Sequence, residues 1–196
     1  MKSQKKAWNK IAEEWAEFRK VPDEKTINFL KKQKGNILDL GCGSGRNFTK
    51  VNGKLYGVDF SRKMLEFAKP KAKKLNVKLV KAKAEKLPFQ NNFFDSAIFL
   101  ASLHCIETKE KRQKAISELY RVLKKGAKAK ISVWNKNSKW FQKKQKEIFI
   151  NWRNKAKRYY YLYDDKEIYD LFKKTGFKIL KKGDSEKNIV FIVGKM

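Results

Sequence analysis

The segment Asp39–Gly45 reads D-L-G-C-G-S-G and follows a short apolar run, and a second acid, Asp59, lies twenty residues beyond the first. Glycines at the end of a strand let the backbone turn sharply and approach a ligand closely, because no Cβ intervenes. A carboxylate that ends the next strand can accept hydrogen bonds from ribose hydroxyls. Together these residues predict a binding site for a nucleoside-containing cofactor.

The glycine spacing bears on which cofactor this is. A dinucleotide-binding loop reads G-x-G-x-x-G and places a pyrophosphate at the amino end of a helix. Here the spacing is Gly41-x-Gly43-x-Gly45, and Asp39 stands two residues before the first glycine. A carboxylate there would repel a pyrophosphate, whereas it suits a cationic amino-acid moiety or ordered water. The alternative is a glycine-rich turn in an unrelated α/β protein.

Length and cysteine content limit the class of protein. A chain of 196 residues predicts one domain, residues 1–196, that buries a core without disulfides. Cys42 and Cys105 form no metal-ligand pattern, so we expect no metal site and a reduced, cytoplasmic protein. No run of 18 apolar residues and no apolar signal core is present, so neither a membrane span nor secretion is expected.

The charge of the chain is strongly positive. Lys and Arg number 49 against 20 Asp and Glu, which gives a formal net charge of +29. A cationic surface of this size favours a polyanionic partner, and RNA is the obvious candidate. The alternative is a general lysine bias, because Lys is spread along the whole chain rather than clustered.

Hydrophobic periodicity and capping residues predict alternating helices and strands. The expected helices are 5–19, 22–35 opened by Pro22, 44–51, 61–75, 109–123, one around 139–152, and one capped by Asp164 and closed by Gly176. The expected strands are 36–40, 54–58, 77–82, 94–100, 128–134, 177–180 and 189–193, the last two joined by a turn at Gly183-Asp184. This alternation predicts an α/β fold with a seven-stranded, mostly parallel sheet, helices on both faces and a C-terminal antiparallel strand.

The glycine segment followed by Val58-Asp59 resembles motif one and the acidic loop of the class I S-adenosylmethionine (SAM) methyltransferases. The helix Trp8–Trp15 is similar to the Y-D-x-I-A-x-x-Y helix of the type 11 group, which covers the cofactor. Leu87–Phe89 with Asn92–Asp95 resembles its L-P-F…F-D stretch, and Glu118–Gly126 its E-x-x-R-V-L-K-P-G block. The resemblance implies a Rossmann-like fold with SAM as cofactor.

Two further segments resemble one branch of that family. Leu103–Arg112 is similar to the H-H-x-x-T-x-x-R-R segment of the tRNA wobble-uridine carboxymethyl methyltransferases, and Arg158–Tyr163 to their R-Y-Y-H-L-Y segment. Arg19 before Pro22 resembles the arginine of their T-R-Y-K-P-W-P entry. The chain therefore resembles the archaeal branch of this family, which implies O-methylation of a carboxylate on a modified wobble uridine of tRNA.

The resemblance divides the chain into functional segments. Residues 1–34 correspond to cofactor-covering helices, 35–135 to the nucleoside-binding core, 136–163 to a basic aromatic substrate segment, and 164–196 to a C-terminal helix and strand pair. The implied cofactor-binding residues are Asp39, Gly41, Gly43, Gly45, Asp59, Ala84 and Glu85.

The implied catalytic residues are Arg19, His104, Arg158 and Tyr159. A carboxylate acceptor is already ionised and needs no base, but it does need cations and donors to hold it, and an arginine fork suits its geometry. His104 follows the predicted strand 94–100 and is expected to face the acceptor, with a core histidine as the alternative.

The chain departs from the family pattern at three positions. The second histidine of the H-H segment is Cys105, and the histidine of R-Y-Y-H is Tyr161. The acid that in relatives accepts a hydrogen bond from the adenine amino group is Lys83, and an ammonium has no acceptor. The adenine contact then falls to the backbone near Ala84 or to Glu85, and we expect weaker cofactor binding.

The segment around 152–161 interleaves basic and aromatic residues. Its cations suit phosphates and its rings suit unstacked bases, unless the rings belong to the core behind a solvated loop. The members are Trp152, Arg153, Lys155, Lys157, Arg158, Tyr159, Tyr160 and Tyr161.

Partners besides tRNA also follow from the resemblance. Family members work with a small zinc-containing activator subunit that extends the sheet at its third strand, here 77–82. Lys78 and Lys81 could equally protect that edge from unwanted strand pairing.

The sequence is compatible with two other functions. One is a SAM-dependent methyltransferase of a small molecule. The other is a SAM-binding or RNA-binding protein without catalysis, which Lys83 suggests. An amino-group methyltransferase is not favoured, because the chain lacks an N/D-P-P-Y/F run, and neither cysteine has the setting of a pyrimidine nucleophile.

Overall fold

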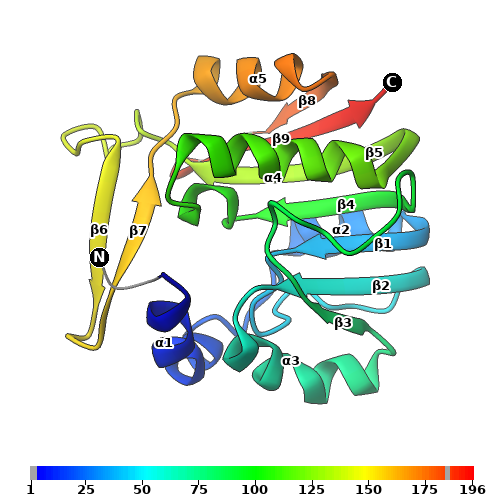
Figure 1. Cartoon of the computed structure of the whole chain (residues 1–196), viewed down its shortest axis with the longest axis horizontal. Coiled ribbons are helices and arrows are strands. Elements are labelled where there is room, and N and C mark those ends of the chain that lie inside the picture. The colour runs from blue at the N-terminus through cyan, green and yellow to red at the C-terminus, as the bar shows by residue number, and fades with distance from the viewer. Residues whose placement is uncertain (1–3, 184–185) are drawn as a thin grey trace.

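The computed structural model describes residues 4–183 and 186–196. Its centre is a seven-stranded sheet of order β3-β2-β1-β4-β5-β9-β8 (Figure 1). The strands are β1 (Lys34–Leu40), β2 (Asn52–Asp59), β3 (Lys78–Lys81), β4 (Phe94–Leu100), β5 (Leu123–Trp134), β8 (Phe177–Gly183) and β9 (Asn188–Lys195). The first five are parallel to one another, and β9 is antiparallel to both β5 and β8. The predicted α/β architecture is confirmed.

Helices cover both faces of the sheet because successive residues of a strand point to opposite sides. They are α1 (Gln4–Phe18), α2 (Glu24–Lys31), α3 (Arg62–Lys74), α4 (Lys109–Val122) and α5 (Asp165–Lys174), with a short 3₁₀ helix, η1 (Leu103–Cys105). In β1, Ile37 packs in a cluster with Leu30 of α2 and Ala68 of α3. Its neighbour Leu38 packs on the other face, in a cluster with Leu119 of α4 and residues of α5.

The strand order places a crevice at the carboxyl ends of the central strands. β1 pairs with β2 on one side and with β4 on the other, so the chain leaves the middle of the sheet in opposite directions. Open α/β sheets bind ligands at such a point. The glycine segment follows β1, Asp59 ends β2, and Ala101 with Ser102 follows β4. Residues far apart in sequence therefore converge there.

The predicted helix around 139–152 is wrong. The chain forms turns and then an antiparallel hairpin, β6 (Glu147–Trp152) and β7 (Ala156–Tyr161), separate from the main sheet. In β6 the half-buried Ile148 and Ile150 alternate with exposed residues, which is the period of a strand. Arg153 and Asn154, with φ of 41° and 57°, make the turn. That alternation is the feature of the sequence that could have predicted a strand here instead of a helix.

The predicted helix 44–51 is also wrong. The segment is a series of turns, in which Gly45 N–H donates to Cys42 O at 3.0 Å and Phe48 N–H donates to Gly45 O at 3.1 Å. The buried Phe48 ring occupies the space beside Gly45 and Gly57, so the glycine loop packs onto the sheet through a side chain rather than through a helix.

Several element boundaries differ from the predicted ones. Asp23, not Pro22, precedes α2, because its carboxylate accepts from Thr26 N–H at 2.8 Å and caps the helix. β5 begins at Leu123 rather than at 128, passing through Gly126 at φ 81°. Gly183 ends β8, and Asp184 of the expected turn lies outside the described residues.

Helix α1 lies away from the sheet and bridges α3 and the β6–β7 hairpin (Figure 1). On the α3 side, Ser61 Oγ donates to Asn9 Oδ1 at 2.7 Å. On the hairpin side, Trp152 Nε1 donates to Glu14 Oε2 at 2.8 Å, and the β7 backbone donates to Gln4 Oε1 at 2.9 Å. These polar contacts hold α1 over the carboxyl ends of the strands.

Candidate functional site

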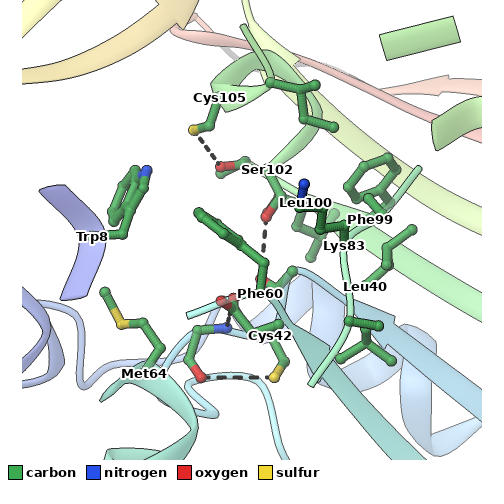
Figure 2. Close-up of a pocket in the computed structure, with 18 of the residues that line it drawn as sticks. Trp8, Leu40, Cys42, Phe60, Met64, Lys83, Phe99, Leu100, Ser102 and Cys105 are labelled. Atoms are coloured by element: carbon green, nitrogen blue, oxygen red, sulfur yellow. Dashed lines mark hydrogen bonds between the residues drawn. The ribbon is translucent and has the colours of Figure 1, made fainter. Parts of the chain in front are cut away.

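A cavity of about 570 Å³ lies where α1 covers the carboxyl ends of the central strands. This volume falls within the range of small-molecule and cofactor sites. Figure 2 shows side chains converging on it from α1 (Trp8), the glycine loop (Cys42), α3 (Met64) and the end of β4 (Leu100).

The three loop glycines are required for two different reasons. Gly41, Gly43 and Gly45 have φ of 74°, 55° and 77°, a region that residues with a Cβ rarely adopt. A Cβ at Gly41 would lie 2.2 Å from Ser102 Oγ, and one at Gly45 would lie 2.6 Å from the Phe48 ring. A Cβ at Gly43 would meet nothing within 4 Å, and Gly43 lines the cavity. Packing requires Gly41 and Gly45, whereas Gly43 leaves bare backbone facing the ligand space.

Asp59 connects the end of β2 to the glycine loop. Its Oδ2 accepts from Gly43 N–H at 2.9 Å and its Oδ1 accepts from Ser61 N–H at 2.8 Å. Burial raises the pKa of this carboxyl to about 6, against the lowering effect of those backbone donors. Asp59 lines the cavity, so its remaining lone pairs are available to ligand hydroxyls.

Asp39 lies beneath the loop, does not line the cavity, and is only 2% exposed. Its Oδ2 is buried and has no hydrogen-bond partner in the structure. Burial raises its pKa to about 7; the nearby Arg46 guanidinium opposes this rise and Asp59 adds to it. A buried carboxylate with an unused oxygen fits a ligand that brings positive charge above the loop. This charge, the bare backbone at Gly43 and the acceptor at Asp59 together fit SAM.

The segment after β3 forms another wall of the cavity through Ala82, Lys83, Ala84 and Glu85. Figure 2 draws Lys83 among the side chains that line the cavity, as it does Leu100 at the end of β4. Within residues 4–183 and 186–196, no carboxylate forms a salt bridge with Lys83. Glu85 is the carboxylate that this wall offers to a ligand.

Arginines gather on the α1 side of the cavity. Arg19 lines it, with the guanidinium 5.5 Å from the Trp15 ring centroid. Burial lowers the pKa of Arg19, and the positive charges of Arg46 and Arg158 lower it further. Arg158 lies behind the wall, 5% exposed; it is 5.1 Å from the same Trp15 ring and donates from Nη1 to Tyr160 OH at 2.6 Å. Its buried Nε has no partner in the structure.

His104 and Tyr159 are placed differently from the sequence expectation. Neither lines the cavity, and both are at most 2% exposed. Nδ1 of His104 accepts from Trp134 N–H at 3.1 Å, and burial lowers the pKa of His104 to about 3. Tyr159 OH accepts from Arg112 Nη1 at 3.0 Å. The alternative reading of His104 as a core histidine matches this geometry, and its ring is neutral.

Arg112 and Arg46 were not among the predicted site residues, although Arg112 ends the segment 103–112 that resembles the family. Arg112 is 4% exposed and donates from Nη1 to Ile106 O at 2.9 Å and Glu107 O at 3.1 Å, two residues that line the cavity. Arg46 also lines the cavity. The available signals were an arginine directly after the glycine loop and an arginine on the apolar face of a helix.

None of the helices within residues 4–183 and 186–196 is long and apolar enough to cross a membrane. No group of three or more His, Cys, Asp or Glu side chains in that part of the chain could hold a metal ion.

The sequence of this chain is similar to those of known proteins. Residues 38–131 match the family model Methyltransf_11, described as a methyltransferase domain. A protein of Encephalitozoon cuniculi whose name describes it as a methyltransferase is 30% identical over 81% of this chain and 78% of its own length. Protein MJ1123 of Methanocaldococcus jannaschii is 33% identical over 89% of this chain and 82% of its own.

A third relative matches over a shorter region. The tRNA (carboxymethyluridine(34)-5-O)-methyltransferase of Arabidopsis thaliana is 38% identical over 50% of this chain, a stretch that is 24% of that protein.

Solved structures share the fold. A SAM-dependent methyltransferase of Methanosarcina mazei superposes with a TM-score of 0.74 at 20% identity, over 90% of this chain and 99% of its own. A chain from the complex of the Haloferax volcanii Trm112 methyltransferase activator with a methyltransferase gives 0.77 at 15% identity, over 98% and 97%. The family model and the Encephalitozoon cuniculi relative show that the chain belongs to the methyltransferases, and its glycine loop, two acids and cavity lie on the fold of the SAM-dependent enzymes among them.

Proposed function

We propose that this methyltransferase acts on a modified wobble uridine of tRNA and methylates a carboxylate oxygen. The observation that carries the proposal is that Arg19 and Arg46 line the cavity and Arg158 lies behind its wall, with the charges of Arg46 and Arg158 close enough to lower the pKa of Arg19. None of these three guanidiniums forms a salt bridge within residues 4–183 and 186–196. Unpaired guanidiniums beside a cavity suit an anionic acceptor. The partial match to an enzyme named for carboxymethyluridine supports the same choice.

The cofactor supplies a methyl group on a sulfonium, and the protein mainly has to align it with the acceptor. Correct positioning alone can contribute roughly 7–11 kcal/mol to the lowering of a barrier. A carboxylate acceptor requires no proton transfer, so the neutral, buried His104 is not needed as a base. In this proposal Arg19 contacts the acceptor directly. Arg158, Tyr159 and His104 then act behind the cavity wall as positioning residues.

The cofactor-binding roles are assigned in the same proposal. Asp59 accepts from the ribose hydroxyls, and the backbone of Gly41, Gly43 and Gly45 contacts the amino-acid end of SAM. Asp39 balances the positive charge of the cofactor from below. On the wall after β3, Ala84 offers backbone groups to the adenine, and Glu85 accepts from its amino group in place of the acid that Lys83 replaces.

An activator subunit is part of the proposal. β3 is the outermost strand on its side of the sheet, with Lys78 and Lys81 exposed and Leu79 and Val80 half-buried between them. A short, partly apolar edge strand suits the addition of a partner strand. A structural neighbour comes from a complex with a methyltransferase activator. We propose that a comparable small subunit docks on 77–82, and that the protein works in the cytoplasm as one domain.

Methyl transfer into tRNA tests the proposed function. Purified protein, with and without the activator, is incubated with labelled SAM and tRNA from a strain that lacks the gene. The label should enter the wobble nucleoside, as identified by mass spectrometry. Arg19→Gln should lower the rate, whereas Arg62→Gln, on the exposed face of α3, should not. Label that enters only small molecules, or SAM binding without any transfer, would support one of the two other functions instead.

A further inference from the structure

Two exposed aromatic side chains, Phe18 and Trp140, lie at opposite ends of one series of neighbouring aromatic rings and cations, which begins beside the cavity. Phe18 is 61% exposed and Trp140 is 57% exposed, although both are large rings. A cation is attracted to the face of an aromatic ring, and each of these two rings has one beside it, Arg19 at Phe18 and Lys187 at Trp140.

The first end of this series of rings and cations lies on α1. The Phe18 ring lies 5.4 Å from the Trp152 ring and 6.2 Å from Trp15, which lines the cavity. The Arg19 guanidinium lies 5.8 Å from the Phe18 ring centroid and lines the cavity as well. Phe18 is therefore a supported ring directly outside the acceptor side of the site.

The series of rings and cations continues through the core to its second end, at Trp140. Arg158 lies 5.1 Å from the Trp15 ring and 5.3 Å from that of Tyr160, which stacks on Trp134 at 4.1 Å. Lys187 Nζ then lies 5.3 Å from the Trp134 ring and 5.1 Å from that of Trp140.

The cations at the two ends of the series, Arg19 and Lys187, influence each other. Burial lowers the pKa of Lys187, and the positive charge of Arg19 lowers it further. The nearby Glu186 pairs with Lys139 at 2.9 Å, so Lys187 keeps its charge for another partner. Two ring-and-cation pairs, Phe18 with Arg19 and Trp140 with Lys187, thus flank the same region.

We propose that these two pairs form a rim on which the unpaired nucleobases next to the acceptor nucleotide stack, while Lys187 holds a phosphate between them and Arg19 holds the acceptor. The inference rests on the proposed function and adds where the RNA lies. Single-stranded nucleic acid is bound in this way, by flat rings for the bases and cations for the backbone. The net charge of +29 favours the same partner.

The position of this rim differs from that expected from the sequence. The aromatics of 152–161 were the candidates for stacking, but Trp152, Tyr159 and Tyr160 are at most 8% exposed and belong to the core. Of these buried rings, Trp152 packs against Phe18 at 5.4 Å and supports it from behind. Aromatic residues outside that segment therefore supply the exposed faces.

Binding of a fluorescent RNA hairpin with an unpaired loop, measured by anisotropy, tests the rim. Phe18→Leu and Trp140→Leu should each weaken binding by roughly 5- to 150-fold, the range for one stacked base. Phe67→Leu, a 40% exposed ring on α3, is the matched control and should leave binding unchanged. Lys187→Gln should reduce the salt dependence of binding by roughly one phosphate contact. SAM affinity, measured by calorimetry, should stay constant in all four variants.

The outcomes separate the rim from the proposed function. If the wild-type protein methylates tRNA but Phe18→Leu and Trp140→Leu bind the hairpin as tightly as Phe67→Leu, the rim is overturned and the function stands. If a fully paired duplex or poly-glutamate binds as tightly as the hairpin loop, the surface recognises negative charge alone and the proposed stacking rim is also wrong. If labelled methyl never enters tRNA, the proposed function fails independently of these affinities.

Discussion

The Asp59 carboxylate accepts a hydrogen bond from the backbone N–H of Gly43 at 2.9 Å. The acid at the end of β2 thus fixes the loop that follows β1, and both residues line the cavity. Cofactor binding and loop geometry therefore depend on the same carboxylate.

Asp59→Asn should weaken SAM binding on the order of tenfold to a hundredfold, because a charged acceptor is lost and the amide NH₂ faces backbone donors. Asp95→Asn is the control: Asp95 also accepts from a backbone N–H, that of Asn36 at 2.8 Å, but does not line the cavity. Calorimetric titration with SAM should show the loss in the first variant and not in the second. Equal losses would mean that the effect is one of folding.

Gly43→Ala should bind SAM poorly while remaining folded. The added Cβ meets no protein atom within 4 Å, so the cost to folding is that of a positive φ, about 1 kcal/mol. The same methyl occupies the space facing the ligand. Gly126→Ala has the same kind of backbone, φ 81°, and open space, but lies outside the cavity. Thermal unfolding should show similar losses in both variants, with SAM binding lost in Gly43→Ala only.

The stability of the cofactor-free protein should depend on Asp39 in a defined direction. The pKa of Asp39 is raised from its ordinary value of 3.8 to about 7, so between these values the folded state holds a proton that the unfolded state releases. Stability therefore falls as pH rises through this window. Asp39→Asn should be more stable than the wild type at pH 8, by on the order of a few kcal/mol, and equal to it near pH 4. Urea unfolding of both proteins at several pH values measures the difference.

Lys83→Asp should tighten SAM binding by about tenfold, because it restores an acceptor for the adenine amino group. Lys86→Asp changes the net charge equally but lies outside the cavity, so it is the control. Calorimetry should show tighter binding only in Lys83→Asp. Equal tightening in both variants would reduce the effect to long-range charge, and no tightening would mean that the adenine does not contact this position.

His104 should matter for stability rather than for cofactor affinity. His104→Leu leaves the Trp134 N–H without its acceptor and should cost about 1–3 kcal/mol, whereas His104→Asn keeps an acceptor oxygen and should cost less. The pKa of His104 is lowered from 6.5 to about 3, so the wild type should lose stability as pH falls through this window, where only the unfolded state takes up the proton. Urea unfolding at pH 4 and 8 should show that His104→Leu lacks this contribution. A large loss of SAM affinity in either variant would place His104 in the site.

Local features of the sequence were enough to predict the α/β architecture and a nucleoside-containing cofactor, which the resemblance to a known family then specified as SAM. Glycines at fixed spacing and acids at the ends of two predicted strands impose backbone conformations and charges that few arrangements satisfy. Short-range periodicity also identified α3 and α4, whose apolar faces repeat every three to four residues. These signals lie within a few residues of one another, so the chain alone displays them.

Tertiary packing decided which predicted residues face the cavity. His104 and Tyr159 both belong to segments that resemble the family, but both are buried away from the cavity. The His104 ring packs against Trp134 and Tyr160, and Tyr159 on β7 packs against Phe149 and accepts a hydrogen bond from Arg112, because burying aromatic rings favours folding more than exposing them. Trp152 and Tyr160 lie on the β6–β7 hairpin and are buried, whereas Phe18 and Trp140 lie at the surface. Arg46 and Arg19 are far apart in sequence, yet both line the cavity and the charge of Arg46 lowers the pKa of Arg19. Contacts between segments that are far apart in the chain decide exposure, and no local pattern records them.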